Sequence, residues 1–97
     1  MNELDPNVHQ PTRLRILMLL SGVDSADFNF LRTTLGLTNG NLSAHTQRLE
    51  EAGYITVNKT FGERIPRTTY ALTEVGREQL DEYWRIMDEV RASGAAG

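Results

Sequence analysis

Amide and hydroxyl side chains are concentrated in one stretch of the chain, residues 37–55. A helix over residues 39–52, with Thr38 as its N-cap, would place the apolar side chains on a single stripe. That stripe consists of Leu42, Leu49 and Ala52. The remaining positions carry mostly small or polar side chains, notably Asn39, Asn41, Ser43, Ala44, Gln47 and Arg48. Asn, Ser and Gly favour a helix less than Glu and Lys do, so helix stability alone does not explain this composition.

The chemistry that suits these amides is the reading of base edges. Asn and Gln each present a donor and an acceptor side by side, so they can pair with adenine in the major groove of double-stranded DNA. The stretch therefore predicts a helix that reads DNA sequence, ended by Gly53 in a left-handed conformation. The alternative for this segment is an ordinary half-buried helix with a polar outer face.

The distribution of charge favours this prediction, although the 97-residue chain is acidic overall, with a formal net charge of −3. Attraction to phosphates dominates nucleic-acid affinity, so a negative total is unfavourable by itself. Residues 28–72, however, hold five basic residues against three acidic ones. The flanking residues 1–27 hold two against four, and residues 73–97 hold three against six. Positive charge thus collects around the predicted reading helix.

Several classes of protein are disfavoured by the composition. The chain has no cysteine, which removes disulfides, thiolate nucleophiles and sulfur-ligated zinc. His9 and His45 lack a local cluster of His, Asp or Glu, so no metal or other cofactor is expected. No grouping of residues indicates an enzyme. Without a signal-peptide pattern or a membrane-length apolar run, we expect a soluble, cytoplasmic, single-domain protein over residues 1–91.

The segments before the reading helix begin with a helix rich in aliphatic residues. Pro11 is expected to open this helix, which covers residues 11–20. The apolar residues occupy most of its circumference, so we expect only Thr12, Arg13 and Arg15 to lie outside.

A second, shorter helix is expected over residues 30–35, after a loop at residues 22–27. Asn29 can cap its start and Gly36 can end it. Together with the reading helix and the turn at residues 36–38, this segment has the pattern of a helix-turn-helix. Helix pairs joined by short turns are common, so the segments that follow matter for the interpretation.

Two β-strands joined by a basic loop are expected after the reading helix. Residues 54–58 and 68–72 alternate with β-branched side chains, and Gly62 supports a turn between them. The connecting segment, residues 59–67, supplies positive charge at Lys59, Arg64 and Arg67. A basic hairpin in this position is the layout of a wing, whose tip contacts phosphates or the minor groove. Alternatively, these cations belong to a solvated hairpin edge that they protect from further pairing.

A long final helix is expected over residues 74–91, capped by Thr73. Its apolar side chains recur at steps of three and four residues, at Leu80, Tyr83, Trp84, Met87 and Val90. An aromatic pair beside a methionine on the last helix of a small domain suits a dimerisation surface. The alternative is a helix that packs only within its own chain. Residues 92–97 are expected to form a disordered tail.

The order of these elements resembles the winged helix-turn-helix of small transcriptional regulators, between the MarR-like and ArsR-like groups. The first-helix signature of ArsR-like repressors is similar to the run HQPTRLRIL, and the strand-to-helix junction of MarR-like regulators is similar to YALTEVGREQL. The resemblance implies an α+β, mainly α fold with a three-helix core, a β-hairpin wing and a long C-terminal dimerisation helix. It also implies a homodimer, with DNA contacts at Asn39, Asn41, Ser43, Ala44, Gln47, Arg48, Lys59, Arg64 and Arg67.

The chain departs from the family pattern at a few positions. Thr46 stands where these families usually have a leucine, so its hydroxyl needs a partner, which we expect to be the carbonyl one turn earlier. Ala44 stands where a longer polar or basic residue is common, which weakens that contact. The metal-binding cysteines of ArsR-like sensors are absent, so their sensing chemistry does not carry over.

Residues and resemblance together predict a homodimeric regulator of transcription that binds a pseudo-palindromic operator in double-stranded DNA. Its reading helices would enter successive major grooves. A small-molecule effector, which the sequence does not identify, could shift such a dimer if it were held between the last helix and the reading head. The alternative from another class is a winged-helix protein-protein interaction module that binds no DNA and uses Trp84 as its anchor.

Overall fold

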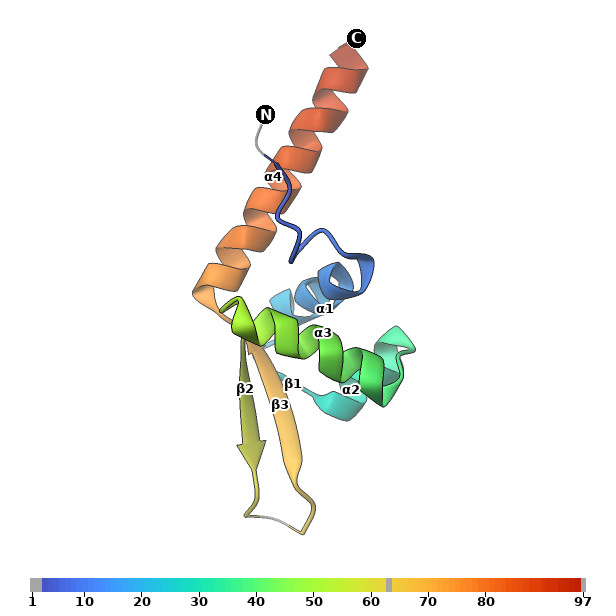
Figure 1. Ribbon diagram of the computed structural model, residues 1–97. Helices are drawn as coiled ribbons and strands as arrows, with labels where there is room; N and C mark the ends of the chain where they lie inside the picture. The colour runs from blue at the N-terminus through green and yellow to red at the C-terminus, as the bar shows by residue number, and fades with distance from the viewer. Residues whose placement is uncertain (1–2, 63, 97) are drawn as a thin grey trace.

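The computed structural model describes residues 3–62 and 64–96 of the 97-residue chain (Figure 1). Within these residues the prediction of a mainly helical winged fold is confirmed. The elements are α1 (Pro11–Ser21), β1 (Ala26–Asp27), α2 (Phe28–Leu35), α3 (Asn39–Glu51), β2 (Ile55–Thr60), β3 (Arg67–Leu72) and α4 (Glu74–Ala96). The wing and α4 project in opposite directions from the helical core, so the molecule measures 59 × 25 × 21 Å (Figure 1).

α1 begins at Pro11, whose missing N–H costs nothing at the first helical position. The Gln10 side chain caps the helix by accepting a 2.7 Å hydrogen bond from the Arg13 backbone N–H. The side chains of Ile16, Leu17 and Leu20 are completely buried. The prediction that the Arg13 side chain lies outside is wrong, because it is only 9% exposed. Apolar periodicity misses such a residue, since a guanidinium can be buried when its donors find acceptors.

α2 begins two residues earlier than predicted, and its cap is Asp27 rather than Asn29. The Asp27 carboxylate accepts a 2.7 Å hydrogen bond from the Phe30 N–H. Asp and Asn are equally good caps, so contacts outside the helix must decide which of the two residues caps it. Ala26 and Asp27, expected in a loop, form β1 and pair with β3. This pairing holds Asp27 extended, as a cap requires.

α3 is capped by Thr38, whose hydroxyl accepts a 3.1 Å hydrogen bond from the Asn41 N–H, as predicted. The helix ends at Glu51, one residue before the predicted end, and Gly53 has a φ of 81°. The prediction for Thr46 is confirmed, because its hydroxyl donates to the Leu42 carbonyl at 2.9 Å.

The three strands form one antiparallel sheet in the order β1-β3-β2. The β2–β3 pairing extends from Ile55 opposite Leu72 to Thr60 opposite Arg67. The strands are therefore longer toward the wing tip than predicted, and Lys59 and Arg67 belong to strands rather than to the loop.

α4 is capped by Thr73, whose hydroxyl accepts a 2.9 Å hydrogen bond from the Gly76 N–H, as predicted. The same hydroxyl donates to the Gly53 carbonyl at 2.7 Å, which joins the start of α4 to the end of α3. The helix runs through Ala96, whereas a disordered tail was expected over residues 92–97; Gly97 lies outside the described residues. Once a helix exists, each further residue adds a hydrogen bond, and Ala favours this extension most.

The core lies between α1, α2, α3, the sheet and the first half of α4. It contains Val8, Ile16, Leu17, Leu20, Ala26, Leu31, Leu42, Leu49, Ile55, Tyr70, Leu80 and Tyr83. α3 contributes Leu42 and Leu49, both fully buried, and α4 contributes Leu80 and Tyr83. The reading helix is thus fixed from one side only.

We predict that Gly76→Ala destabilises the protein. A Cβ at this buried position would lie 2.1 Å from the Tyr54 carbonyl oxygen, so α4 would have to move away from that backbone. Overpacking of this kind costs about 1–3 kcal/mol, which thermal unfolding followed by circular dichroism would detect. Gly94→Ala is the control, because no atom beyond its chain neighbours and its own helix backbone lies within 4 Å of its Cβ position, and the substitution is expected to be neutral or slightly stabilising.

Candidate nucleic-acid interface

The predicted base-reading residues share the outer face of α3. The side chains at this face are all exposed, namely Asn39, Asn41, Ser43, Ala44, Gln47 and Arg48. The opposite face is buried through Leu42, Thr46 and Leu49. This separation is what a helix that enters a groove requires, although contact with DNA remains a prediction.

A groove of about 560 Å³ separates α3 from the wing strands. It is lined by Ser43, Thr46, Gln47, Glu50, Val57, Lys59 and Tyr70. Lys59 therefore lies beside two of the predicted α3 contacts. Glu50 brings a carboxylate to the same groove. Burial raises the pKa of the Tyr70 hydroxyl, and the Glu50 charge adds to this effect.

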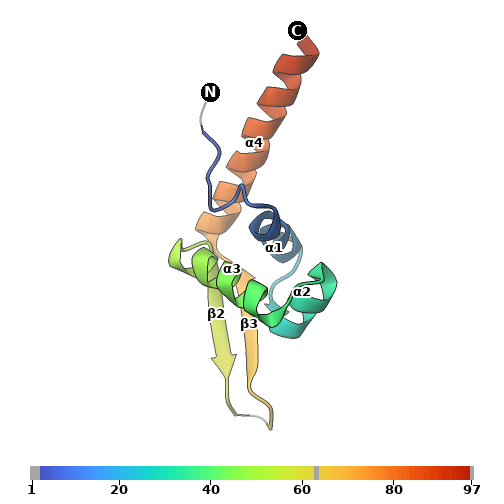
Figure 2. The same ribbon diagram turned by 45° about the vertical axis from the view of Figure 1, so that its right-hand side comes forward.

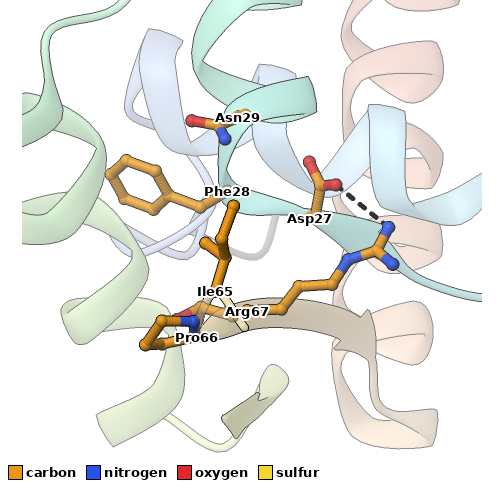
Figure 3. A pocket seen from close by; sticks show the side chains of 7 residues that line it. Asp27, Phe28, Asn29, Ile65, Pro66 and Arg67 are labelled. Atoms are coloured by element: carbon orange, nitrogen blue, oxygen red, sulfur yellow. Dashed lines mark hydrogen bonds and ion pairs between the residues drawn. The ribbon is translucent and has the colours of Figure 1, made fainter. Parts of the chain in front are cut away.

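The three predicted wing cations are not equivalent. Lys59 and Arg64 are exposed. Arg67, in contrast, forms a 3.1 Å ion pair with Asp27, at the junction of β1 and α2 (Figure 3). Sequence reasoning placed Arg67 in the loop with the other two, and only the β1–β3 pairing explains its partner. Phe61 and Ile65 near the wing tip are 73% and 77% exposed, and sequence reasoning gave them no role.

Asp27 links the helix-turn-helix to the wing. One carboxylate oxygen caps α2 through the Phe30 N–H, and the other receives the Arg67 guanidinium. The Phe30 hydrogen bond and the Arg67 interaction hold the pKa of Asp27 below its ordinary value. Figure 3 shows this pair at the side of a cavity of about 400 Å³ lined by α2 and wing residues. The pair therefore links the first residue of β3 to the start of α2.

The predicted dimerisation residues divide into two groups. Leu80 and Tyr83 are buried within the chain's own core, and Met87 is half-buried against it. Trp84 and Val90 are 38% and 46% exposed, and the Trp84 ring meets the Tyr83 ring edge-on. Much of the seam thus packs internally, and its outer part is exposed.

The two histidines are engaged separately. His9 Nδ1 lies 3.0 Å from the Tyr83 hydroxyl, and His45 Nδ1 lies 3.3 Å from the Arg13 guanidinium. In residues 3–62 and 64–96 no group of three or more His, Asp or Glu residues could hold a metal ion. None of the helices in these two ranges is both long and apolar enough to cross a membrane.

The family of the chain follows from comparison with known proteins. Residues 12–90 match the family described as the winged helix DNA-binding domain, and the chain belongs to this family. An uncharacterized protein of Methanocaldococcus jannaschii is 37% identical over 71 residues, which cover 73% of this chain and 77% of that one.

Solved structures agree with this assignment. A transcriptional regulator homologue from Pyrococcus horikoshii OT3 is similar with a TM-score of 0.84 and 30% identity, over 90% of this chain and 86% of that chain. A protein described as a MarR-family transcriptional regulator from Enterococcus faecalis V583 has the same fold, with a TM-score of 0.76 and 22% identity, over 93% and 83% of the two chains. The resemblance to winged helix-turn-helix regulators is thus confirmed, and family and fold together support a DNA-binding regulator.

We predict that the two roles of Asp27 can be separated by substitution. Asp27→Asn keeps the cap and loses the ion pair, so it should cost less than about 0.5 kcal/mol in urea unfolding. Asp27→Ala loses both and should cost about 1 kcal/mol. Equal losses for the two variants would assign the stabilisation to the ion pair.

The stability difference between wild type and Asp27→Ala should also depend on pH, in a direction that the pKa of Asp27 defines. Because folding lowers the pKa of Asp27, its carboxylate stabilises the fold above the ordinary value of 3.8 and loses this effect as the pH falls through the folded value. The difference between wild type and Asp27→Ala should therefore shrink on acidification. A difference that grows with acid would contradict the lowered pKa.

Proposed function

We propose that this protein is a homodimeric, sequence-specific regulator of transcription that binds double-stranded DNA. In this proposal α3 enters the major groove, and the wing, residues 59–67, lies on the backbone or in the minor groove. One observation carries it: Asn41 and Gln47 are exposed on the face of α3 opposite its buried stripe. Buried amides would have made base reading impossible.

Different side chains have different roles in the proposal. The amides of Asn39, Asn41 and Gln47 specify bases, since they offer paired donors and acceptors. Ser43 and Ala44 lie between them and permit close approach of the helix. Other residues position the protein on phosphates, namely Arg48, Lys59 and Arg64. Arg67 orients the wing through Asp27 and contributes less to the backbone contact.

The dimer in this proposal forms through the outer part of α4. Trp84 and Val90 are exposed there, and Met87 borders them. Leu80 and Tyr83 support this surface from within the chain. A two-fold dimer would present its α3 helices about 34–36 Å apart, so we expect a pseudo-palindromic operator. A small-molecule effector between α4 and the reading head would alter this spacing.

Fluorescence anisotropy with random duplex DNA at low and raised salt tests the proposal directly. Binding that weakens with salt is expected. A protein-protein interaction module, the other function that this fold supports, would bind no duplex. Selection of bound duplexes from a random pool should then return sites with two-fold symmetry.

We predict that Asn41→Ala and Gln47→Ala each relax preference at particular bases. Each loss should reduce discrimination by about 1–3 kcal/mol, measured as the ratio of affinities for the selected site and single-base variants. Gln79→Ala removes an amide from α4 instead and should leave the ratio unchanged. Undiminished discrimination in both α3 variants would remove the assigned base-reading role.

Arg64→Ala is predicted to weaken binding to all sequences and to flatten the salt dependence. Loss of one phosphate contact should lower the slope of log affinity against log salt by about 1. Arg91→Ala is the matched control, since Arg91 is exposed on α4 and paired with Asp88. An unchanged slope for Arg64→Ala would show that the wing tip does not contact phosphates.

A further inference from the structure

The segment before α1, residues 4–10, touches each of the units that must keep their places during DNA binding. We call it the N-terminal strap; Figures 1 and 2 both show it beside α4. The Tyr54 hydroxyl, at the base of the wing, donates to the Asp5 carboxylate. The Tyr83 hydroxyl, on α4, lies 3.0 Å from His9 Nδ1. The strap thus bridges the wing base and α4.

Arg13 connects this strap to α3. Its Nε donates to the Asn7 carbonyl at 2.9 Å, and its Nη2 donates to the Pro6 carbonyl at 3.1 Å. Its Nη1 lies 3.3 Å from Nδ1 of His45, which is on α3. A guanidinium has donors only, so Nδ1 must be the acceptor and the proton of neutral His45 must be on Nε2. The planar guanidinium of Arg13 therefore contacts two strap carbonyls and the His45 imidazole at the same time.

The Arg13–His45 contact supplies a directional restraint on α3 that aliphatic packing does not. Burial of Leu42 and Leu49 is stabilising but depends little on direction, whereas a hydrogen bond has a preferred angle. His45 lies between Ala44 and Gln47 on the helix, close in sequence to the proposed base contacts. A rotation of α3 about its axis would stretch the hydrogen bond and turn the amides away from the bases.

We propose that Arg13 is a positioning residue for DNA recognition, which sets the rotation of α3 by holding neutral His45 against the N-terminal strap. This inference rests on the proposed function. Arg13 is 9% exposed and makes its contacts inward, so it acts through His45 and not on phosphates. Its guanidinium is shared between α1, the strap and α3.

The surrounding charges favour the neutral form of His45. Burial lowers its pKa, and the positive charges of Arg13 on α1 and Arg48 on α3 lower it further. Burial and the Arg48 charge lower the pKa of Arg13, while the Asp5 charge on the strap opposes this shift and favours the charged guanidinium. If His45 carried a proton on Nδ1, this nitrogen would be a donor facing the Arg13 N–H, and the hydrogen bond would be lost.

The first test compares Arg13→Lys with Arg15→Lys for binding to the selected duplex. Lysine keeps the charge but cannot reproduce the fork, so Arg13→Lys should weaken specific binding about tenfold with an unchanged salt slope. Arg15 is exposed on the same helix, so Arg15→Lys should bind like wild type. Both are assayed below their melting temperatures. A lowered salt slope in Arg13→Lys would instead assign it a phosphate contact and overturn the inference.

The second test decides the matter even if Arg13→Lys does not fold. In His45→Asn the amide oxygen occupies nearly the place of Nδ1, so the hydrogen bond and the affinity should be retained. His45→Leu removes the acceptor and should lose affinity as Arg13→Lys does. Equal binding by these two variants would overturn the inference. If wild type binds DNA and all variants match it, only this inference fails; if wild type binds no duplex, the proposed function fails as well.

A third measurement needs no DNA. Nitrogen-15 spectra of the imidazoles in wild-type protein should report His45 with its proton on Nε2, and its titration midpoint should lie below the ordinary value of 6.5. Removal of the Arg13 charge by Arg13→Met should raise that midpoint. A proton on Nδ1 at neutral pH would contradict the contact on which the inference depends.

Discussion

The one-sided burial of α3 is the constraint on which the rest of the structure depends. Leu42 and Leu49 are completely buried and Thr46 is nearly so, which leaves the opposite face to solvent. A turn of the helix by one residue would bury Asn41 or Gln47 without partners, at a cost of about 1–3 kcal/mol for each unsatisfied group. The Thr46 hydroxyl avoids this cost because it bonds within its own helix. The same packing that stabilises the core therefore keeps the amides outside.

Positive charge in this protein is divided between structural and surface positions. Arg13 is buried and serves the strap and α3, and Arg67 is paired with Asp27. Arg48 on α3, Lys59 on β2 and Arg64 in the loop between β2 and β3 remain exposed. A count of basic residues along the sequence therefore overstates the charge that is free to attract phosphates. Hydrogen bonding from α3 and the geometry of two subunits carry correspondingly more of the proposed recognition.

Features of the fold that arise from local interactions could be predicted from the sequence. Thr38 and Thr73 cap their helices, and Gly53 adopts a positive φ. Each of these features involves only residues a few positions apart in the sequence. The exposure of the amide face likewise followed from helical periodicity. The cap at Asp27 could not be predicted, because Asn29 is an equally good cap and the pairing of β1 with a distant strand decides between them.

The burial of Arg13 and Ile86 was missed for a related reason. Arg13 finds its acceptors in the strap and on α3, and neither contact is visible in the pattern of its own helix. Ile86 is 3% exposed, although the apolar spacing on α4 had indicated its neighbour Met87 and not Ile86. Tertiary contacts decide such positions. The exposed fractions of Trp84 and Val90 leave a surface for a partner, but which atoms meet there depends on a second molecule.

The hydroxyl of Thr73 has a mechanical consequence. It donates to the Gly53 carbonyl and accepts from the Gly76 N–H, while the Thr73 N–H donates to the Tyr54 carbonyl at 3.0 Å. These hydrogen bonds hold the start of α4 against the residues that directly follow α3. In the proposed dimer, a small tilt of α4 would therefore change the position of α3 relative to the DNA. An effector that binds near α4 would then release α3 from the DNA without contacting the bases.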